Sequence, residues 1–173
     1  HASRLTGFYT LFNKEWLRFW KVKVQTILAP VLTALLFLVV FAYSLRDRVE
    51  IFPGVDYAAF LVPGLAMMSV LQNAFANGSS SLMQSKMTGN IIFVLLPPLS
   101  YQEFFAAYLL AAAARGLVVG AGVFLTTVWF VDLRFEHPLW ALAFAVASSG
   151  VLGVLGIIAG IYSDKVDELS AFQ

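Results

Sequence analysis

The chain of 173 residues is 60% hydrophobic and 12% charged, and its mean hydropathy is +0.82. A soluble domain carries about 25% charged residues, so this composition excludes an ordinary soluble domain and indicates a protein solvated by lipid. The absence of cysteine excludes disulfides, thiolate metal sites and thiol catalysis. The net charge of +1 is uninformative as a sum, so the positions of the charges carry the information.

Residues 4–21 have the pattern of an amphipathic helix. Lys14, Arg18 and Lys21 fall on the side opposite an aromatic face. A basic face opposite an aromatic face predicts a helix that lies in the lipid headgroup region. The residues that we expect at the membrane interface are Phe8, Phe12, Trp16, Phe19 and Trp20.

Four long apolar stretches follow, and each is predicted to be a transmembrane helix. They are residues 25–43, 57–76, 104–131 and 139–162. The first has 19 residues and no charge, close to the roughly 20 that cross a bilayer. The third, with 28 residues, must tilt or project into the cytoplasm. We therefore expect an all-α integral membrane protein, a single domain over residues 1–173 with an amino-terminal interfacial helix and four transmembrane helices.

The positions of lysine and arginine predict the orientation. If the amino terminus is cytoplasmic, the inner segments hold Arg4, Lys14, Arg18, Lys21, Lys23, Lys86 and Lys165. The outer loops then hold Arg46, Arg48 and Arg134. This excess predicts a cytoplasmic amino terminus, and it places residues 79–101 in the cytoplasm.

Residues 79–101 differ from a simple connecting loop. The first part is polar enough to sit in water, and Ile91–Leu96 are then six consecutive apolar residues. Pro97 and Pro98 end any helix there. Because exposed apolar patches usually mark docking surfaces, we predict that this segment binds a soluble partner.

Arg115 is the only charged residue inside a predicted span. If the membrane begins at Phe104, Arg115 lies near mid-depth, and it should face the bundle interior. No acid is expected at matching depth, so the amides of Gln72, Asn73 and Asn77 are the nearest candidate partners. Two interpretations stay open: a structural, hydrogen-bonded arginine, or part of a substrate path formed by Asn73, Asn77 and Arg115 that attracts an anionic group.

Glycines in the third and fourth spans predict close helix packing. Gly150, Gly153, Gly156 and Gly160 share one face, and Gly116 and Gly120 form a G-x-x-x-G pair.

Other classes of function lack support. Ser148 and Ser149 have no basic residue within reach to activate them as nucleophiles, so no catalytic residue is expected. No nucleotide-binding P-loop, metal-ligand cluster or nucleic-acid-binding patch is present in the sequence. We therefore expect no cofactor bound by this chain, and no metal or nucleic-acid partner.

These features together resemble the permease subunits of bacterial ABC-2 type exporters. The resemblance runs from Leu5 to Gln173 and rests on Phe60–Ser69 (FLVPGLAMMS), Asn73–Asn77, Lys86, Asn90-Ile91, Pro97-Pro98, Ala114-Arg115-Gly116 and Asp167–Ser170. It implies a bacterial inner-membrane protein with an outward-moving cargo: a lipid, a glycan or a hydrophobic drug. It also implies a permease homodimer and separate ATPase subunits that bind ATP and magnesium.

The same resemblance implies that residues 81–96 rest on the ATPase subunit. The expected coupling residues are Gln84, Ser85, Lys86, Met87, Thr88, Gly89, Asn90, Ile91 and Ile92. Many family members carry more charge just before this glycine, so an ionic contact with the ATPase would rest on Lys86 alone. The family fold has six spans, of which this sequence is expected to contain four.

Two alternatives from other classes remain open. A secondary transporter or channel without an ATPase would favour carboxylates at the bilayer midplane, and the predicted spans contain no Asp or Glu. A membrane scaffold subunit without transport of its own is the third possibility.

Overall fold

The computed structural model describes residues 2–45, 56–96, 100–131 and 137–163. This part of the chain is helical, with no strand. Its elements are α1 (Ala2–Lys21), α2 (Lys23–Leu45), α3 (Tyr57–Met87), α4 (Ile91–Leu95), α5 (Tyr101–Thr127), the 3-10 helix η1 (Val128–Phe130) and α6 (Pro138–Tyr162). The basic residues Arg46, Arg48, Arg134 and Lys165 and the Pro97-Pro98 helix end lie outside the described residues.

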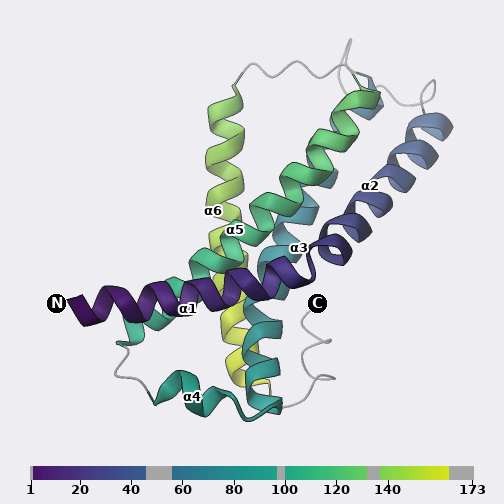
Figure 1. Ribbon diagram of the computed structural model, residues 1–173. Helices are drawn as coiled ribbons and strands as arrows, with labels where there is room; N and C mark the ends of the chain where they lie inside the picture. The colour runs from purple at the N-terminus through teal and green to yellow at the C-terminus, as the bar shows by residue number, and fades with distance from the viewer. Residues whose placement is uncertain (1, 46–55, 97–99, 132–136, 164–173) are drawn as a thin grey trace.

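The helices form a bundle with α3 at its centre. α3 packs along both α5 and α6, and α2 packs against α3 and α5. α1 runs across the bundle at a large angle to the long helices, and α4 lies beyond it at one end (Figure 1). The predicted helix before the first span is therefore present, whereas its place in the headgroup region stays a prediction.

Within the described residues, four helices are long and apolar enough to cross a membrane. They are Lys23–Phe41, Tyr57–Met87, Tyr101–Phe130 and Pro138–Tyr162. Their outward faces expose large apolar side chains, such as Leu36 on α2 and Phe144 on α6. A surface of this kind is stable in lipid rather than in water, so the chain is an all-α integral membrane protein.

The helix that contains the second span continues beyond the predicted end of that span. The prediction ended it at Ala76, but α3 continues to Met87. The residues beyond Ala76 were expected in water, yet Ser79, Ser81 and Ser85 are buried. The hydroxyls of Ser79 and Ser85 donate to carbonyls of the preceding turn, so polar residues continue the helix without leaving unpaired groups.

Small residues bring α3 close to its two neighbours. A Cβ on Gly156 would collide with the carbonyl oxygen of Phe75, and one on Gly160 would lie 2.9 Å from that of Ser79. Gly116 similarly approaches the backbone of Val70, where a Cβ would lie 2.7 Å from the carbonyl oxygen. The predicted packing role is thus confirmed at these positions.

The prediction was wrong for one glycine of the α6 set. A Cβ on Gly150 would meet nothing within 4 Å. Gly150 shares a helical face with the other glycines, but no neighbouring helix lies close enough to exclude a side chain there.

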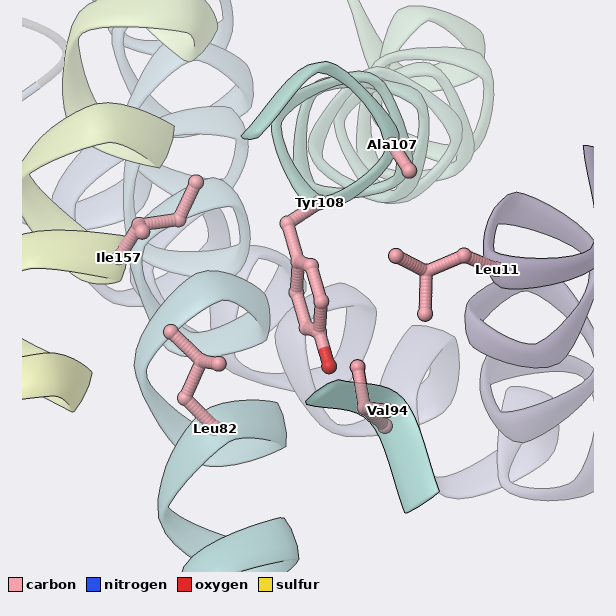
Figure 2. Packing of buried hydrophobic residues seen from close by; sticks show 6 residues of the cluster. All are labelled: Leu11, Leu82, Val94, Ala107, Tyr108 and Ile157. Carbon is pink, nitrogen blue, oxygen red and sulfur yellow. The ribbon is translucent and has the colours of Figure 1, made fainter. Parts of the chain in front are cut away.

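A cluster of buried side chains joins most of the helices at the end that carries α4. Tyr108 of α5 is fully buried at its centre, and its ring points between neighbouring helices (Figure 2). The other members are Leu11 of α1, Leu82 of α3, Val94 of α4, Ala107 of α5 and Ile157 of α6. This cluster fixes α1 and α4 against the long helices.

Candidate functional site

The segment that links α3 to α5 exposes apolar side chains. α4 buries Val94 against the bundle, and four exposed apolar side chains lie on α4 and on the residue that follows it. We call these the α4 ridge: Ile92 (60% exposed), Phe93 (71%), Leu95 (67%) and Leu96 (69%). The exposed apolar surface expected from the sequence is therefore present, whereas its docking role stays a prediction.

A tight turn separates α4 from α3. The backbone of Gly89 has φ = +70°, a conformation that side-chain-bearing residues rarely adopt. The amide of Gly89 donates to the carbonyl of Lys86, and the amide of Thr88 donates to that of Gln84. These bonds end α3 and direct the chain into α4.

The nine predicted coupling residues have different surroundings. Those from Gln84 to Met87 form the last turn of α3, those from Thr88 to Asn90 form the turn, and Ile91 and Ile92 begin α4. Most are exposed, but Ser85 is buried and donates to the carbonyl of Ser81 at 2.9 Å. Ser85 therefore supports the helix from inside, away from any docking surface.

Lys86 contacts the end of α6. Its Nζ donates to the carbonyl of Ile161 and, at 3.1 Å, to that of Ser163. Carbonyls at a helix end lack partners within the helix, and a cation there is favourable. Lys86 therefore joins α3 to α6, and its predicted ionic contact with an ATPase would compete with these bonds.

The start of α5 is fixed by a capping box. The Ser100 hydroxyl accepts from the Glu103 amide at 3.3 Å, and the Ser100 amide donates to Glu103 Oε2 at 2.9 Å. This arrangement satisfies donors that a helix start otherwise leaves unpaired. The linking segment is thus anchored at both ends, by the α3 turn and by this cap.

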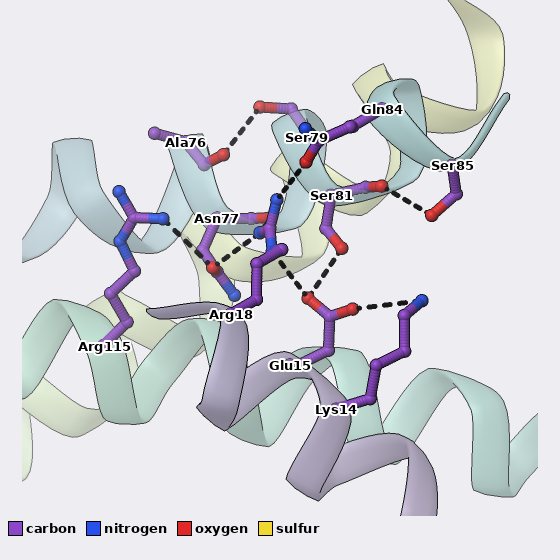
Figure 3. Close-up of polar contacts among 10 residues, drawn as sticks. All are labelled: Lys14, Glu15, Arg18, Ala76, Asn77, Ser79, Ser81, Gln84, Ser85 and Arg115. Atoms are coloured by element: carbon purple, nitrogen blue, oxygen red, sulfur yellow. Dashed lines mark hydrogen bonds and ion pairs between the residues drawn. The ribbon is translucent and has the colours of Figure 1, made fainter. Parts of the chain in front are cut away.

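Arg115 is hydrogen-bonded to Asn77. Its Nη1 donates to Asn77 Oδ1 at 3.2 Å, and Arg18 Nη2 donates to the same oxygen at 3.0 Å (Figure 3). The prediction that a nearby amide serves Arg115 is confirmed for Asn77. Asn73 instead donates to the carbonyl of Ser69 at 3.1 Å, and Gln72 is exposed.

Glu15 is the acidic member of this cluster, and sequence reasoning missed it. Its side chain is 0% exposed, accepts from Ser81 Oγ at 2.6 Å and lies 3.4 Å from Arg18 Nε (Figure 3). Lys14 Nζ lies 3.6 Å away on the exposed side. An acid near Arg115 was not expected from the sequence, because α1 was predicted to lie apart from the bundle.

The position of Arg18 also corrects the expected basic face. Arg18 does not point away from the protein but toward α3, where it contacts Asn77 and Gln84. Glu15 and Arg18 are spaced i and i+3, a separation that brings charged side chains together on a helix. That spacing was the available signal for an internal ion pair. We call Glu15, Arg18, Asn77, Ser81 and Arg115 the charge cluster.

The predicted interface aromatics are not equivalent. Phe19 is only 2% exposed, so burial in the protein corrects its expected position at the lipid surface, and its ring centre lies 6.0 Å from the Arg115 guanidinium carbon. Trp20 is exposed, and Phe8, Phe12 and Trp16 are half-buried. Phe12 stacks on Phe8 and Trp16, so Phe8, Phe12 and Trp16 form a continuous aromatic row along α1.

An apolar groove lies between α3, α5 and α6. It has a volume of about 580 Å³ and includes Pro63, Met67, Val70, Phe124, Leu142 and Phe144 among its lining residues. Groups of acidic and histidine residues that could hold a metal are absent from the described part of the chain.

The four spanning helices, the crossing amino-terminal helix and the anchored α4 segment define a multi-pass membrane domain. The chain belongs to the ABC-2 type transporter family, whose model matches residues 6–173. It is 32% identical over 161 residues to the inner membrane transport permease YadH of Escherichia coli (strain K12) and to the protein of the same name in Shigella flexneri. Each alignment covers 93% of this chain and 63% of the relative's length. No solved structure matches the chain.

Proposed function

We propose that this chain is a membrane-spanning permease subunit of an ATP-driven exporter. A separate ATPase subunit would bind ATP and magnesium, and it would dock on the α4 ridge. Family membership and the names of the relatives support a role in transport. The observation that carries the ATPase proposal is the exposed α4 ridge, held in place by a turn and a capping box.

The helix α3 would transmit movement directly from the docking surface into the membrane. It runs without interruption from Tyr57 to Met87, and it packs closely on the backbones of both α5 and α6. Displacement of the turn at Thr88–Asn90 would therefore shift α3 together with its neighbours. This is how ATP binding on a partner would act on the spans.

The proposed orientation follows from the same surface. An ATPase is cytoplasmic, so the α4 end and the amino terminus would both face the cytoplasm of a bacterial inner membrane. α1 would lie among the inner-leaflet headgroups, with Trp16 and Trp20 near the lipid. Two copies of the permease would form the transmembrane part of the exporter.

The cargo would be a lipid, a glycan or a hydrophobic drug moved outward. The apolar groove beside Met67 and Phe124 would hold an apolar portion of the cargo. Asn77 and Arg115 remain candidates for contact with a polar portion. Asn73 is a weaker candidate, since its amide already donates within α3.

The docking proposal is tested by placing a charge on the α4 ridge. Ile92→Asp and Phe93→Asp should each abolish co-purification with an ATPase subunit that contains a nucleotide-binding P-loop, while the amount of permease in the membrane is unchanged. Leu139→Asp, at an exposed residue in the first turn of α6, is the matched control and should retain the ATPase.

Retention of the ATPase by both ridge variants would refute the docking role. If the wild-type protein moves its cargo with no ATPase present, a secondary transporter would be the better assignment. The orientation is tested by Thr88→Cys, at an exposed position in the turn. A membrane-impermeant thiol reagent should label it only after the cells are opened.

A further inference from the structure

The charge cluster lies at the level of α1. Arg115 and Arg18 share the Asn77 oxygen, and the Arg115 guanidinium approaches the Phe19 ring. If α1 lies among headgroups, as proposed above, Arg115 is at headgroup depth rather than near the mid-depth expected from the sequence.

The cluster holds more positive than negative charge. Two guanidinium groups converge on one amide oxygen, at 3.0 and 3.2 Å. The carboxylate of Glu15 pairs with Arg18, and no acid within the described ranges forms an ion pair with Arg115. Like charges this close repel strongly where solvent is partly excluded. An anion between the two arginines would relieve that repulsion.

The arginines also have unused hydrogen-bonding capacity. Arg115 Nε is buried and donates to no acceptor within the described part of the chain. The Arg18 side chain is 27% exposed, so the cluster is reachable from outside. Guanidinium groups bind phosphate through paired hydrogen bonds, which makes arginine the preferred residue for this group.

We propose that Arg18 and Arg115 together bind the phosphate group of an anionic amphiphile from the inner leaflet. The inference rests on the proposed membrane placement, and it assigns a chemical class to the polar end of a cargo or regulatory lipid. Asn77 holds the two guanidiniums in place when the site is empty. Glu15 orients Arg18, and the exposed Trp20 and half-buried Trp16 border the same stretch of α1.

Binding is measured on the intact protein in a neutral maltoside detergent. The probes are dioctanoyl phosphatidic acid, inorganic phosphate and dioctanoylglycerol, and the readout is the rise in unfolding temperature with probe concentration, fitted to a Kd. Arg18→Gln and Arg115→Gln should each raise the Kd for phosphatidic acid about tenfold or more, because each removes charge-assisted hydrogen bonds. Lys14→Gln, on the exposed side of Glu15, should change it less than about twofold.

The three probes distinguish the source of the phosphate. Binding of phosphatidic acid alone supports a lipid, and equal binding of inorganic phosphate supports the same site occupied by a free ion. If Arg115→Gln does not fold, Arg115→Lys keeps the charge without the paired geometry, and it should raise the Kd severalfold.

An unchanged Kd in both arginine variants would overturn the proposal. An equal rise in the Kd for Lys14→Gln would also overturn it. So would dioctanoylglycerol binding as tightly as phosphatidic acid, because the arginines would then not be recognising the phosphate. None of these results depends on an ATPase, so this inference can fail while the docking role of the α4 ridge stands.

Discussion

The two sides of α3 are built in opposite ways. Toward α6, backbone approaches backbone, and Gly156 and Gly160 leave no space for side chains. Toward α1, long polar side chains bridge the helices, and Arg18 contacts both Asn77 and Gln84. The first contact depends on missing side chains, whereas the second depends on long side chains that share buried acceptors. We infer that α3 and α6 move as one unit.

The largest effect is expected on the polar side. Glu15→Ala should lower the free energy of unfolding by about 3 kcal/mol, because it leaves Arg18 and Ser81 without their buried acceptor. Thermal unfolding in detergent measures the loss. Lys14→Ala, 45% exposed on the same helix, should cost less than about 0.5 kcal/mol. A cost for Glu15→Ala no greater than for Lys14→Ala would mean that the charge cluster contributes nothing to the contact between α1 and α3.

A smaller loss is expected on the glycine side. Gly156→Ala should destabilise the protein by about 2 kcal/mol, because the new methyl group would collide with the Phe75 carbonyl and push α6 from α3. Gly150→Ala is the matched control on the same helix, since it meets nothing within 4 Å, and it should be neutral or slightly stabilising. The same assay compares the two. Equal stability of both variants would show that the α3–α6 contact can adapt, contrary to the rigid-pair inference.

The smallest effect is expected at Lys86, which adds a polar contact to the α6 side of α3. Lys86→Ala should cost about 1 kcal/mol, through loss of its bonds to the α6 carbonyls. Lys86→Arg, which can still donate to them, should recover most of the stability. If Lys86→Ala prevents ATPase binding without any change in unfolding temperature, the lysine belongs to the docking surface after all.

The sequence was sufficient to predict the spans because lipid compatibility is a local property. The boundaries of α2, α5 and α6 follow from runs of apolar residues, and helix contacts at Gly116 and Gly156 follow from their spacing. The choice of Asn77 as an Arg115 partner came from matching depth along two helices. The exposed α4 ridge could likewise be predicted, since six consecutive apolar residues precede a proline pair in the sequence.

The missed features depend on contacts between distant helices. Arg18 was placed on the basic outer face, and Glu15 was given no role, because the rotation of α1 was judged from its aromatic residues. Aromatic residues can face lipid or protein equally well. Only the packing of Leu11 and Phe19 against the bundle turns Glu15 inward. The end of α3 was misplaced for a related reason, because Ser81 resembles a loop residue until α1 supplies its partner.

The buried ring of Tyr108 has one more consequence. Side chains of five helices surround it, and α2 supplies none of those in the described cluster. α2 is held instead by separate contacts of Val31 and Leu38 nearer the opposite end of the bundle. The first span is therefore attached to α3 and α5 through its own two clusters, separately from the five helices that share the Tyr108 anchor.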